Sequence, residues 1–310
     1  MTLVVGGSTG SSGENVLRAE GLVKRFSSFT LGPIDLVLQP GTTCGLLGAN
    51  ASGKTTLLNC LAGQYRPTEG NVFVGNESIR FNAHDHRFMV ALFLERVSLY
   101  GDLTVSQILA FVSRLYPSWN HRLVQEWTRG WKLPLDQRLK TISKGTQVKV
   151  ALICTVASGA EWLLLDEPTA GLDPESRWEL QEFLSLLGRE GNTGIVLASH
   201  LFEDIERVAE HLLVMRQGQL VWNGPLVDLV DSRIFAFDQR VAPELDGNIQ
   251  RVDLAHLGAT WFLVRDFDSL TPEVRTSLLG GQELTGRLAD IYFTLQGISR
   301  GRGFPASSGE

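Results

Sequence analysis

The segment Gly48–Thr55 constrains the fold of this chain more than any other feature. Its sequence is Gly-Ala-Asn-Ala-Ser-Gly-Lys-Thr, with four residues between the first glycine and Gly-Lys-Thr. Gly48 and Gly53 permit backbone conformations and close approaches that a Cβ would block, so that successive amide groups can surround a phosphate. Lys54 adds a positive charge for the β- and γ-phosphates, and the Thr55 hydroxyl is a ligand for Mg²⁺. The segment therefore predicts a nucleoside triphosphate site.

The flanking residues supply the context that this motif requires. Residues 43–47 are apolar and predict a buried strand that enters the loop, and residues 54–61 predict a helix whose positive N-terminal end faces the anion. Lys54 is expected to be an exposed charge with phosphate as its only partner. The expected nucleotide-binding residues of the loop are Gly48, Ala49, Asn50, Ala51, Ser52, Gly53, Lys54, Thr55 and Thr56.

A second apolar strand, predicted at 162–165, ends in two acids. An acid at a strand end beside a phosphate loop can hold Mg²⁺, which is the role we expect for Asp166. The neighbouring Glu167 is then placed to polarise an attacking water. The alternative is a solvated acidic turn. Ser143, just upstream, either binds an anion with the exposed amides of a helix start or only caps that helix.

Strands and helices alternate through the rest of this region, which predicts an α/β core with a mainly parallel sheet. Residues 16–40 predict antiparallel strands, and 71–75 predict another short strand. The predicted helical segments are 104–131, 145–157, 175–187 and 288–295, the next buried strand is 195–198, and a hairpin is expected at 212–222 with its turn at Gln217 and Gly218.

Composition limits the classes of function. The chain has 310 residues, is 43% hydrophobic and 20% charged, and carries a net charge of −6. This balance is ordinary for a globular protein and argues against bulk nucleic-acid binding, so no nucleic acid partner is expected. Three cysteines without metal-site spacing suit a reducing compartment. Because no apolar run reaches membrane-spanning length, a cytoplasmic protein is expected.

Taken together, the motifs from about residue 16 to 225 resemble the ATP-binding subunit of an ABC transporter. Gly48–Thr55 matches the Walker A motif, and 163–167 matches Walker B. Residues 143–146 match the signature sequence, 171–174 match the D-loop, and His200 matches the switch histidine. Phe26 is similar to the aromatic residue that stacks on adenine in this family.

The resemblance implies an ATPase that works as a head-to-tail homodimer, with each ATP between the P-loop of one chain and the signature helix of the other. The further ATP-binding residues that it implies are Phe26, Ser143, Lys144, Gly145 and Asp173. The implied catalytic residues are Glu167 and His200, and the implied Mg²⁺ ligands are Thr55, Glu95 and Asp166. A separate transmembrane permease would hold the chain at the cytoplasmic face of the membrane. It would dock on 104–131, whose aromatic residues are Phe111, Tyr116, Trp119, Trp127 and Trp131, about half of them expected in the core.

The chain departs from the family pattern in two places. The signature usually reads Leu-Ser-Gly-Gly-Gln, whereas Ile142, Lys144 and Thr146 stand at three of those positions here. Lys144 is expected to place a positive charge beside the partner's γ-phosphate. Glu95 stands where a glutamine is usual, and its carboxylate still offers an oxygen to Mg²⁺. Residues 278–282 imitate the signature more closely, but they lie behind Walker B and are expected to form a turn.

Glu95, Lys144 and the helix at 288–295 resemble export-type subunits, so export is the expected direction. The expected fold is a P-loop NTPase core with an antiparallel β subdomain, a helical subdomain and a small C-terminal α+β extension. The predicted units are a flexible tail at 1–15, the ATPase domain at 16–230, the extension at 231–298 and a second tail at 299–310. Two alternatives stay open: a soluble ABC ATPase acting on a macromolecular assembly, and a nucleotide-sensing module without turnover.

Overall fold

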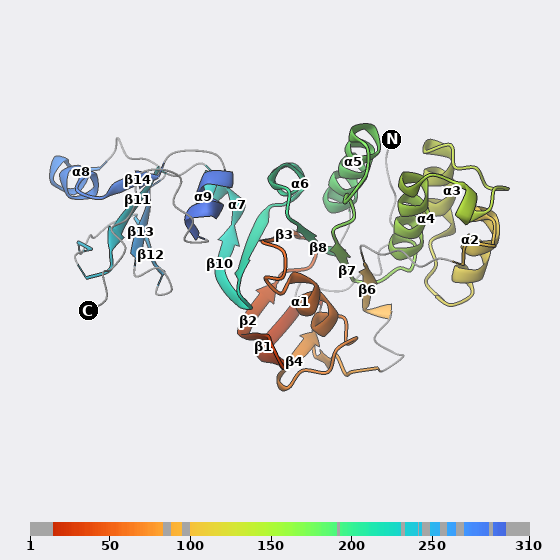
Figure 1. Ribbon diagram of the computed structural model, residues 1–310, viewed down its shortest axis with the longest axis horizontal. Coiled ribbons are helices and arrows are strands. Elements are labelled where there is room, and N and C mark those ends of the chain that lie inside the picture. The colour runs from red at the N-terminus through yellow and green to blue at the C-terminus, as the bar shows by residue number, and fades with distance from the viewer. Residues whose placement is uncertain are drawn as a thin grey trace.

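Figure 1 shows the computed structural model of the chain. The structure describes residues 15–82, 88–94, 100–190, 193–230, 233–240, 242–243, 249–254, 259–264, 270–284 and 288–295. The flexible tails predicted at 1–15 and 299–310 lie outside these residues, apart from Asn15.

The central sheet contains six strands within the described residues, in the order β10-β9-β3-β8-β7-β6. Neighbours from β9 to β6 pair in parallel, whereas β10 is antiparallel to β9. The strands are β3 (Thr43–Gly48), β6 (Val90–Phe93), β7 (Trp162–Asp166), β8 (Gly194–Ser199), β9 (His211–Arg216) and β10 (Gln219–Pro225). The predicted α/β class is confirmed, and so is the hairpin turn: Gln217 and Gly218 both have positive φ, as the type I′ hairpin turn requires.

A second, antiparallel sheet has the order β2-β1-β4-β5. Its strands are β1 (Leu17–Arg25), β2 (Thr30–Leu38), β4 (Glu69–Val74) and β5 (Glu77–Ser78). The helix α1 (Lys54–Leu61), predicted with these bounds, contacts both sheets. Its buried leucines share one apolar core with Leu17 and Leu31 of this sheet and Leu164 of the central sheet. The P-loop helix is therefore fixed on both sides.

The segment predicted as helical at 104–131 forms two helices, α2 (Val105–Ser113) and α3 (His121–Gly130). The division has a local cause, because Asn120 accepts a hydrogen bond from the Leu123 amide and starts a second helix. Trp119 is buried, and Tyr116, Trp127 and Trp131 pack against the core. Phe111 stays exposed beside Tyr100. Of the five aromatic residues of the predicted groove, one is therefore buried, three are partly buried against the core and one is exposed.

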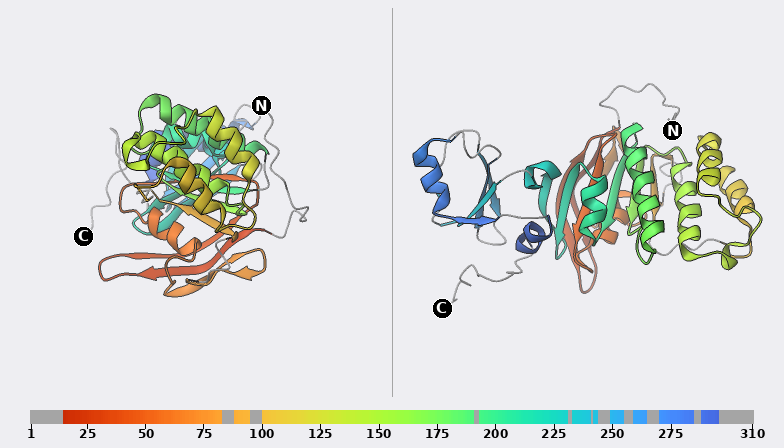
Figure 2. Two further views of the ribbon diagram at one scale, coloured as in Figure 1. Left: turned by 90° about the vertical axis from the view of Figure 1, so that its right-hand side faces the viewer. Right: turned by 90° about the horizontal axis from the view of Figure 1, so that it is seen from above.

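The remaining helices are α4 (Lys144–Val156), α5 (Pro174–Glu190), α6 (Phe202–Val208) and α7 (Leu226–Val230). In Figure 2, α5 and α6 lie over one side of the central sheet, and helices α2–α4 and the C-terminal sheet lie at opposite ends of the molecule.

The C-terminal residues form an antiparallel sheet in the order β12-β13-β11-β14. Its elements are β11 (Arg233–Asp238), β12 (Gln250–Leu254), β13 (Ala259–Val264), α8 (Pro272–Leu279), β14 (Gln282–Leu284) and α9 (Leu288–Leu295). Gly280 and Gly281 form the turn between α8 and β14, whereas Leu278 and Leu279 end α8 and Gln282 begins β14, so the turn predicted at 278–282 is confined to its two glycines. The helix α9 packs against α6 and α7, and the ring of Tyr292 lies 5.1 Å from that of Phe202.

Gly194 at the start of β8 tests how tightly this core is packed. A Cβ there would lie 2.4 Å from the ring of Trp162, which is fully buried. We expect Gly194→Ala to lower the free energy of unfolding by about 1–3 kcal/mol, because an added methyl overpacks the core. Urea denaturation measures it. Gly130→Ala is the control: a Cβ there meets nothing within 4 Å, so no loss is expected, and an equal loss in both variants would contradict the packing argument.

Candidate nucleotide-binding site

The P-loop connects β3 to α1 through a tight turn that two glycines make possible. At Gly48, a Cβ would lie 2.4 Å from Ser52 Oγ and 2.9 Å from the Met215 carbonyl oxygen. Gly53 has φ 109°, a conformation that L side chains rarely adopt. The Ser52 amide donates to the Ala49 carbonyl at 3.1 Å, which closes the turn. Ala49, Asn50 and Ala51 are exposed at its tip, where a phosphate can reach the loop.

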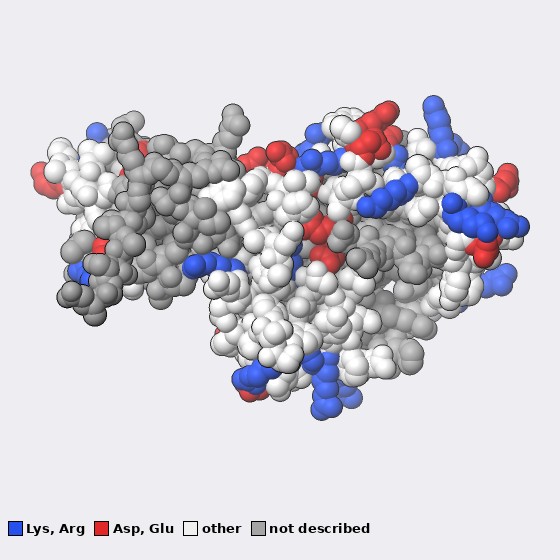
Figure 3. Space-filling model, in the orientation of Figure 1, with Lys and Arg blue, Asp and Glu red and all other residues white. Residues whose placement is uncertain are grey.

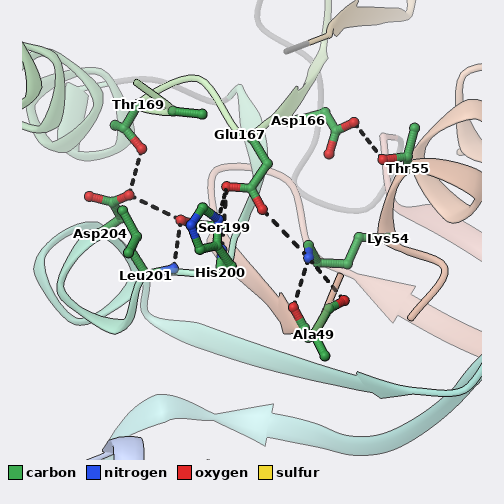
Figure 4. A network of polar contacts seen from close by, with 12 residues as sticks. Ala49, Lys54, Thr55, Asp166, Glu167, Thr169, Ser199, His200, Leu201 and Asp204 are labelled. Atoms are coloured by element: carbon green, nitrogen blue, oxygen red, sulfur yellow. Dashed lines mark hydrogen bonds and ion pairs between the residues drawn. The ribbon is translucent and has the colours of Figure 1, made fainter. Parts of the chain in front are cut away.

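Lys54 is buried, contrary to the exposed charge expected from the sequence: 7% of its surface is accessible. Its Nζ donates to the Gly48 carbonyl oxygen at 2.7 Å and lies 3.5 Å from Glu167 Oε1. Phosphate is therefore not its only partner. The side chain lies back along the loop because the loop carbonyls and the Glu167 carboxylate are the acceptors within reach, as Figure 4 shows.

Thr55 and Asp166 meet across the edge of the sheet. Thr55 Oγ1 donates to Asp166 Oδ2 at 2.7 Å, joining the first turn of α1 to the end of β7. Asp166 is 4% exposed. A hydroxyl and a carboxylate oxygen are the hard donors that Mg²⁺ prefers, so the chemistry of this pair fits that ion. Glu95, the third predicted ligand, lies outside the described residues.

Glu167 follows β7 in a left-handed conformation, with φ 49°. Such a conformation costs a non-glycine residue about 1–3 kcal/mol and persists only where its surroundings hold it. Here the Glu167 amide donates to the Ala198 carbonyl at 2.9 Å. Its Oε2 lies 2.8 Å from Nδ1 of His200, and the His200 amide donates to the same oxygen at 3.3 Å. The backbone thus presents the carboxylate between Lys54 and His200 (Figure 4).

The predicted signature segment lies at the start of α4. Ser143 caps this helix and accepts from the Thr146 amide at 3.1 Å. The exposed Lys144 donates from Nζ to the Ala170 carbonyl of its own chain at 3.0 Å, so in this structure it is bonded to the turn before the D-loop. Gly145 lies against Ser176, because a Cβ there would be 2.9 Å from Ser176 Oγ.

Asp173 serves as a helix cap for α5. Its Oδ1 accepts from the Ser176 amide at 2.9 Å. This backbone hydrogen bond and a second bond from the Ser176 side chain lower the pKa of the Asp173 carboxyl below its usual value, because both favour the charged form. The side chain is exposed, which leaves it accessible to another molecule.

Phe26 lies on an exposed turn beside α1. Its ring is 44% exposed and meets the ring of Tyr65 edge to face at 6.1 Å. The ammonium group of Lys24 lies 5.3 Å from the centre of the Phe26 ring. In the same turn, Phe29 packs on Gly53, where a Cβ would lie 2.9 Å from the Phe29 ring. Tyr65 was not found from the sequence, because it reaches Phe26 only through the pairing of β1 with β4.

Asp204 is a second residue that sequence reasoning missed. It lies on α6, four residues after His200, is fully buried, and bonds to Thr169 and Ser199 beside the two predicted catalytic residues. Its helix also carries Glu203, Glu206 and Arg207, so the sequence does not distinguish the buried acid from exposed ones.

Comparison with known proteins decides the family. The ABC transporter family model matches residues 31–170. The Nod factor export ATP-binding protein I of Cupriavidus metallidurans is 31% identical over 65% of this chain and 68% of its own length. The chain belongs to the ABC transporter family. It is an ATP-binding subunit of the ABC type, and thus an ATPase.

Other comparisons show the fold but not the direction of transport. A dimeric ATP-binding cassette in a post-hydrolysis state with ADP and Pi matches with a TM-score of 0.60 and 19% identity, over 68% of this chain and 98% of that one. The sulfate/thiosulfate import ATP-binding protein CysA 1 of Agrobacterium fabrum is 33% identical over 70% of this chain and 65% of its own length. Relatives of this ABC ATPase thus include importers and exporters, and the predicted export direction is not confirmed. In the part of the chain that the structure describes, no helix is both long and apolar enough to cross a membrane.

The bond from Lys144 to Ala170 makes a testable prediction about the D-loop. We expect Lys144→Met to speed amide hydrogen exchange at Ala170 and Leu172, because the turn loses its bond to α4. Mass spectrometry of peptides spanning 168–173 measures this. Lys140→Met is the matched control, since Lys140 pairs with Asp102 on another surface. Unchanged exchange in Lys144→Met would show that the bond does not hold the turn.

Proposed function

We propose that this ABC ATPase hydrolyses ATP at two sites of a head-to-tail homodimer and drives a separate permease that exports its substrate. One observation carries the site assignment: Lys54, Thr55, Asp166, Glu167 and His200 come from three parts of the chain and converge at one edge of the central sheet. Charge placed in advance around a transferred phosphoryl group is what ATP hydrolysis requires.

The P-loop residues bind the phosphates of ATP. The amides of 48–55 and the dipole of α1 supply the anion site, and Lys54 exchanges its bond to Gly48 for the β- and γ-phosphates. Thr55 and Asp166 would hold the Mg²⁺ ion that accompanies ATP, with Glu95 as a further proposed ligand. When bound, this ion neutralises charge on the β- and γ-phosphates.

Glu167 and His200 act on the attacking water. The carboxylate of Glu167 accepts a proton or orients the water, and its left-handed backbone points it into the site. If Nδ1 of His200 donates to Glu167 Oε2, the opposite ring nitrogen is available to a γ-phosphate. The His200 side chain is 46% exposed, so it can meet a ligand from the solvent side.

The other half of each site comes from the partner chain. Ser143, Lys144 and Gly145 lie at the N-terminal end of the thirteen-residue helix α4, where amides and dipole favour an anion. Asp173, held by Ser176 and exposed, meets the partner near the same phosphate. Phe26 stacks on adenine with its exposed face.

Export through a separate permease rests on two features of this chain. Lys144 in the signature helix and the closing helix α9 are the described features that resemble export-type subunits. The permease would bind the exposed aromatic pair Tyr100 and Phe111 and hold the chain at the membrane. On the face drawn in Figure 3, acidic and basic side chains are interspersed, which favours a protein partner over nucleic acid.

Lys54→Ala tests the phosphate site. We expect ATP affinity to fall about tenfold or more, because a charge-assisted contact with phosphate is lost. Isothermal titration calorimetry with ATP measures it, and thermal unfolding checks that the variant is folded. Lys140→Ala, which removes a lysine from the helical subdomain, is the control and should bind ATP normally. Normal ATP affinity in Lys54→Ala would remove Lys54 from the site.

Glu167→Gln tests the proposed base. We expect kcat to fall about a hundredfold or more while ATP affinity is kept, because the amide cannot take up a proton but keeps the shape of the carboxylate. Steady-state phosphate release measures kcat. ATP should then hold the protein as a dimer in size-exclusion chromatography. Glu206→Gln, an exposed acid on α6, is the control. Normal turnover in Glu167→Gln would show that another group activates the water.

Purification of the protein from membranes tests whether it binds a permease. A polytopic membrane protein that copurifies with both the wild type and the Glu167→Gln variant supports the transporter role. Copurification of ribosomes, or recovery only from the soluble fraction, would favour a soluble ABC ATPase instead.

A further inference from the structure

Asp204 is the most completely bonded charged group at this edge of the sheet. It lies on α6 with none of its surface exposed. Four side chains donate to its carboxylate: Thr169 Oγ1 at 2.5 Å and Ser199 Oγ at 3.0 Å to Oδ2, and Arg177 Nε at 2.7 Å and Gln181 Nε2 at 2.5 Å to Oδ1. Each oxygen thus accepts two hydrogen bonds, which is the full capacity of a carboxylate.

The four donors come from segments that carry the proposed site. Thr169 is two residues after Glu167, and Ser199 immediately precedes His200. Arg177 and Gln181 lie on α5, and the Arg177 amide donates to the carbonyl of Asp173 at 3.0 Å. Figure 4 shows Asp204 joined to Thr169 and Ser199 on the side of His200 away from Lys54. One buried group therefore links the turn after Glu167, the end of β8 and the D-loop helix.

Only a carboxylate satisfies all four donors. Ser199 Oγ also accepts from the Leu201 amide at 3.1 Å, so its hydrogen is directed at Asp204. An amide group in place of the carboxylate would turn a donor towards the two hydroxyls or towards Arg177 and Gln181. Arg177 supplies the positive charge that a buried carboxylate needs, and its other end reaches the exposed Glu203 at 3.2 Å.

We propose that Asp204 is a positioning residue for ATP hydrolysis: it fixes Glu167 and His200 relative to the D-loop helix that meets the partner subunit. The inference rests on the roles proposed for Glu167 and His200. A displacement of about 1 Å in reacting groups can cost about a hundredfold in rate without weakening substrate binding. Loss of the Asp204 carboxylate should therefore act on kcat and not on KM.

The test compares Asp204→Asn with Glu203→Gln. Both changes remove one negative charge next to Arg177 on the same helix, but Glu203 is exposed and bonds to Arg177 from the solvent side. We expect Asp204→Asn to lower kcat about tenfold or more with KM for ATP changed by less than about twofold, and Glu203→Gln to leave both near wild type. Thermal unfolding identifies loss of fold.

A second comparison separates positioning from general destabilisation. In a His200→Ala background, where one of the two groups that Asp204 positions is absent, Asp204→Asn should lower the single-turnover rate less than in the wild type. Equal factors in both backgrounds would overturn the positioning of His200. A kcat for Asp204→Asn equal to that of Glu203→Gln would overturn the proposal as a whole. If Asp204→Asn does not fold, Thr169→Val removes one bond at constant volume, and the same kcat and KM criteria decide.

Failure of the positioning role can be distinguished from failure of the role proposed for Glu167. If Glu167→Gln keeps its turnover, the proposed roles at the site fail. If Glu167→Gln is inactive while Asp204→Asn turns over normally, only the positioning role fails.

Discussion

The parallel pairing of β8 with both β3 and β7 is the constraint on which the site depends. In this register Leu47 lies opposite Ser199, and Asp166 lies opposite Ala198. The P-loop, the two acids and His200 therefore leave the sheet at one edge. A shift of one residue in either pairing would turn the side chains at these strand ends to the opposite face. The relative positions of the motif side chains are thus set by backbone hydrogen bonds between fully buried strands.

Several charged groups of the site bond to one another. Lys54, Glu167 and His200 form a connected series, and Thr55 bonds to Asp166 beside them. Burial makes an unpaired charge costly, so these groups remain bonded to one another. In the proposed function, nucleotide would replace some of those bonds with contacts to phosphate. The contacts of Glu167 with Lys54 and His200 also help to hold its left-handed backbone conformation.

The motifs, the α/β class and the bounds of α1 could be predicted from sequence, because each depends on local spacing or periodicity. The division of 104–131 into α2 and α3 was missed although Asn120 offered a local cap signal, since the apolar period continues across the break. The burial of Lys54, the contact of Tyr65 with Phe26 and the bonds of Asp204 could not be predicted. Each joins residues that are distant in the chain, and only the packed sheets bring them together.

The C-terminal sheet contributes to two apolar clusters. Phe235 and Phe262 form a separate cluster with Leu278 of α8. Ile234 and Trp261 of the same sheet belong to the main core, together with Leu288, Ile291 and Leu295 of α9. Full burial of a leucine or isoleucine contributes about 1.5–3 kcal/mol, so α9 stabilises the core by several such terms. Its rings also pack on Phe202, two residues before Asp204 on α6. Helix α9 is therefore part of the structure that supports the proposed catalytic edge.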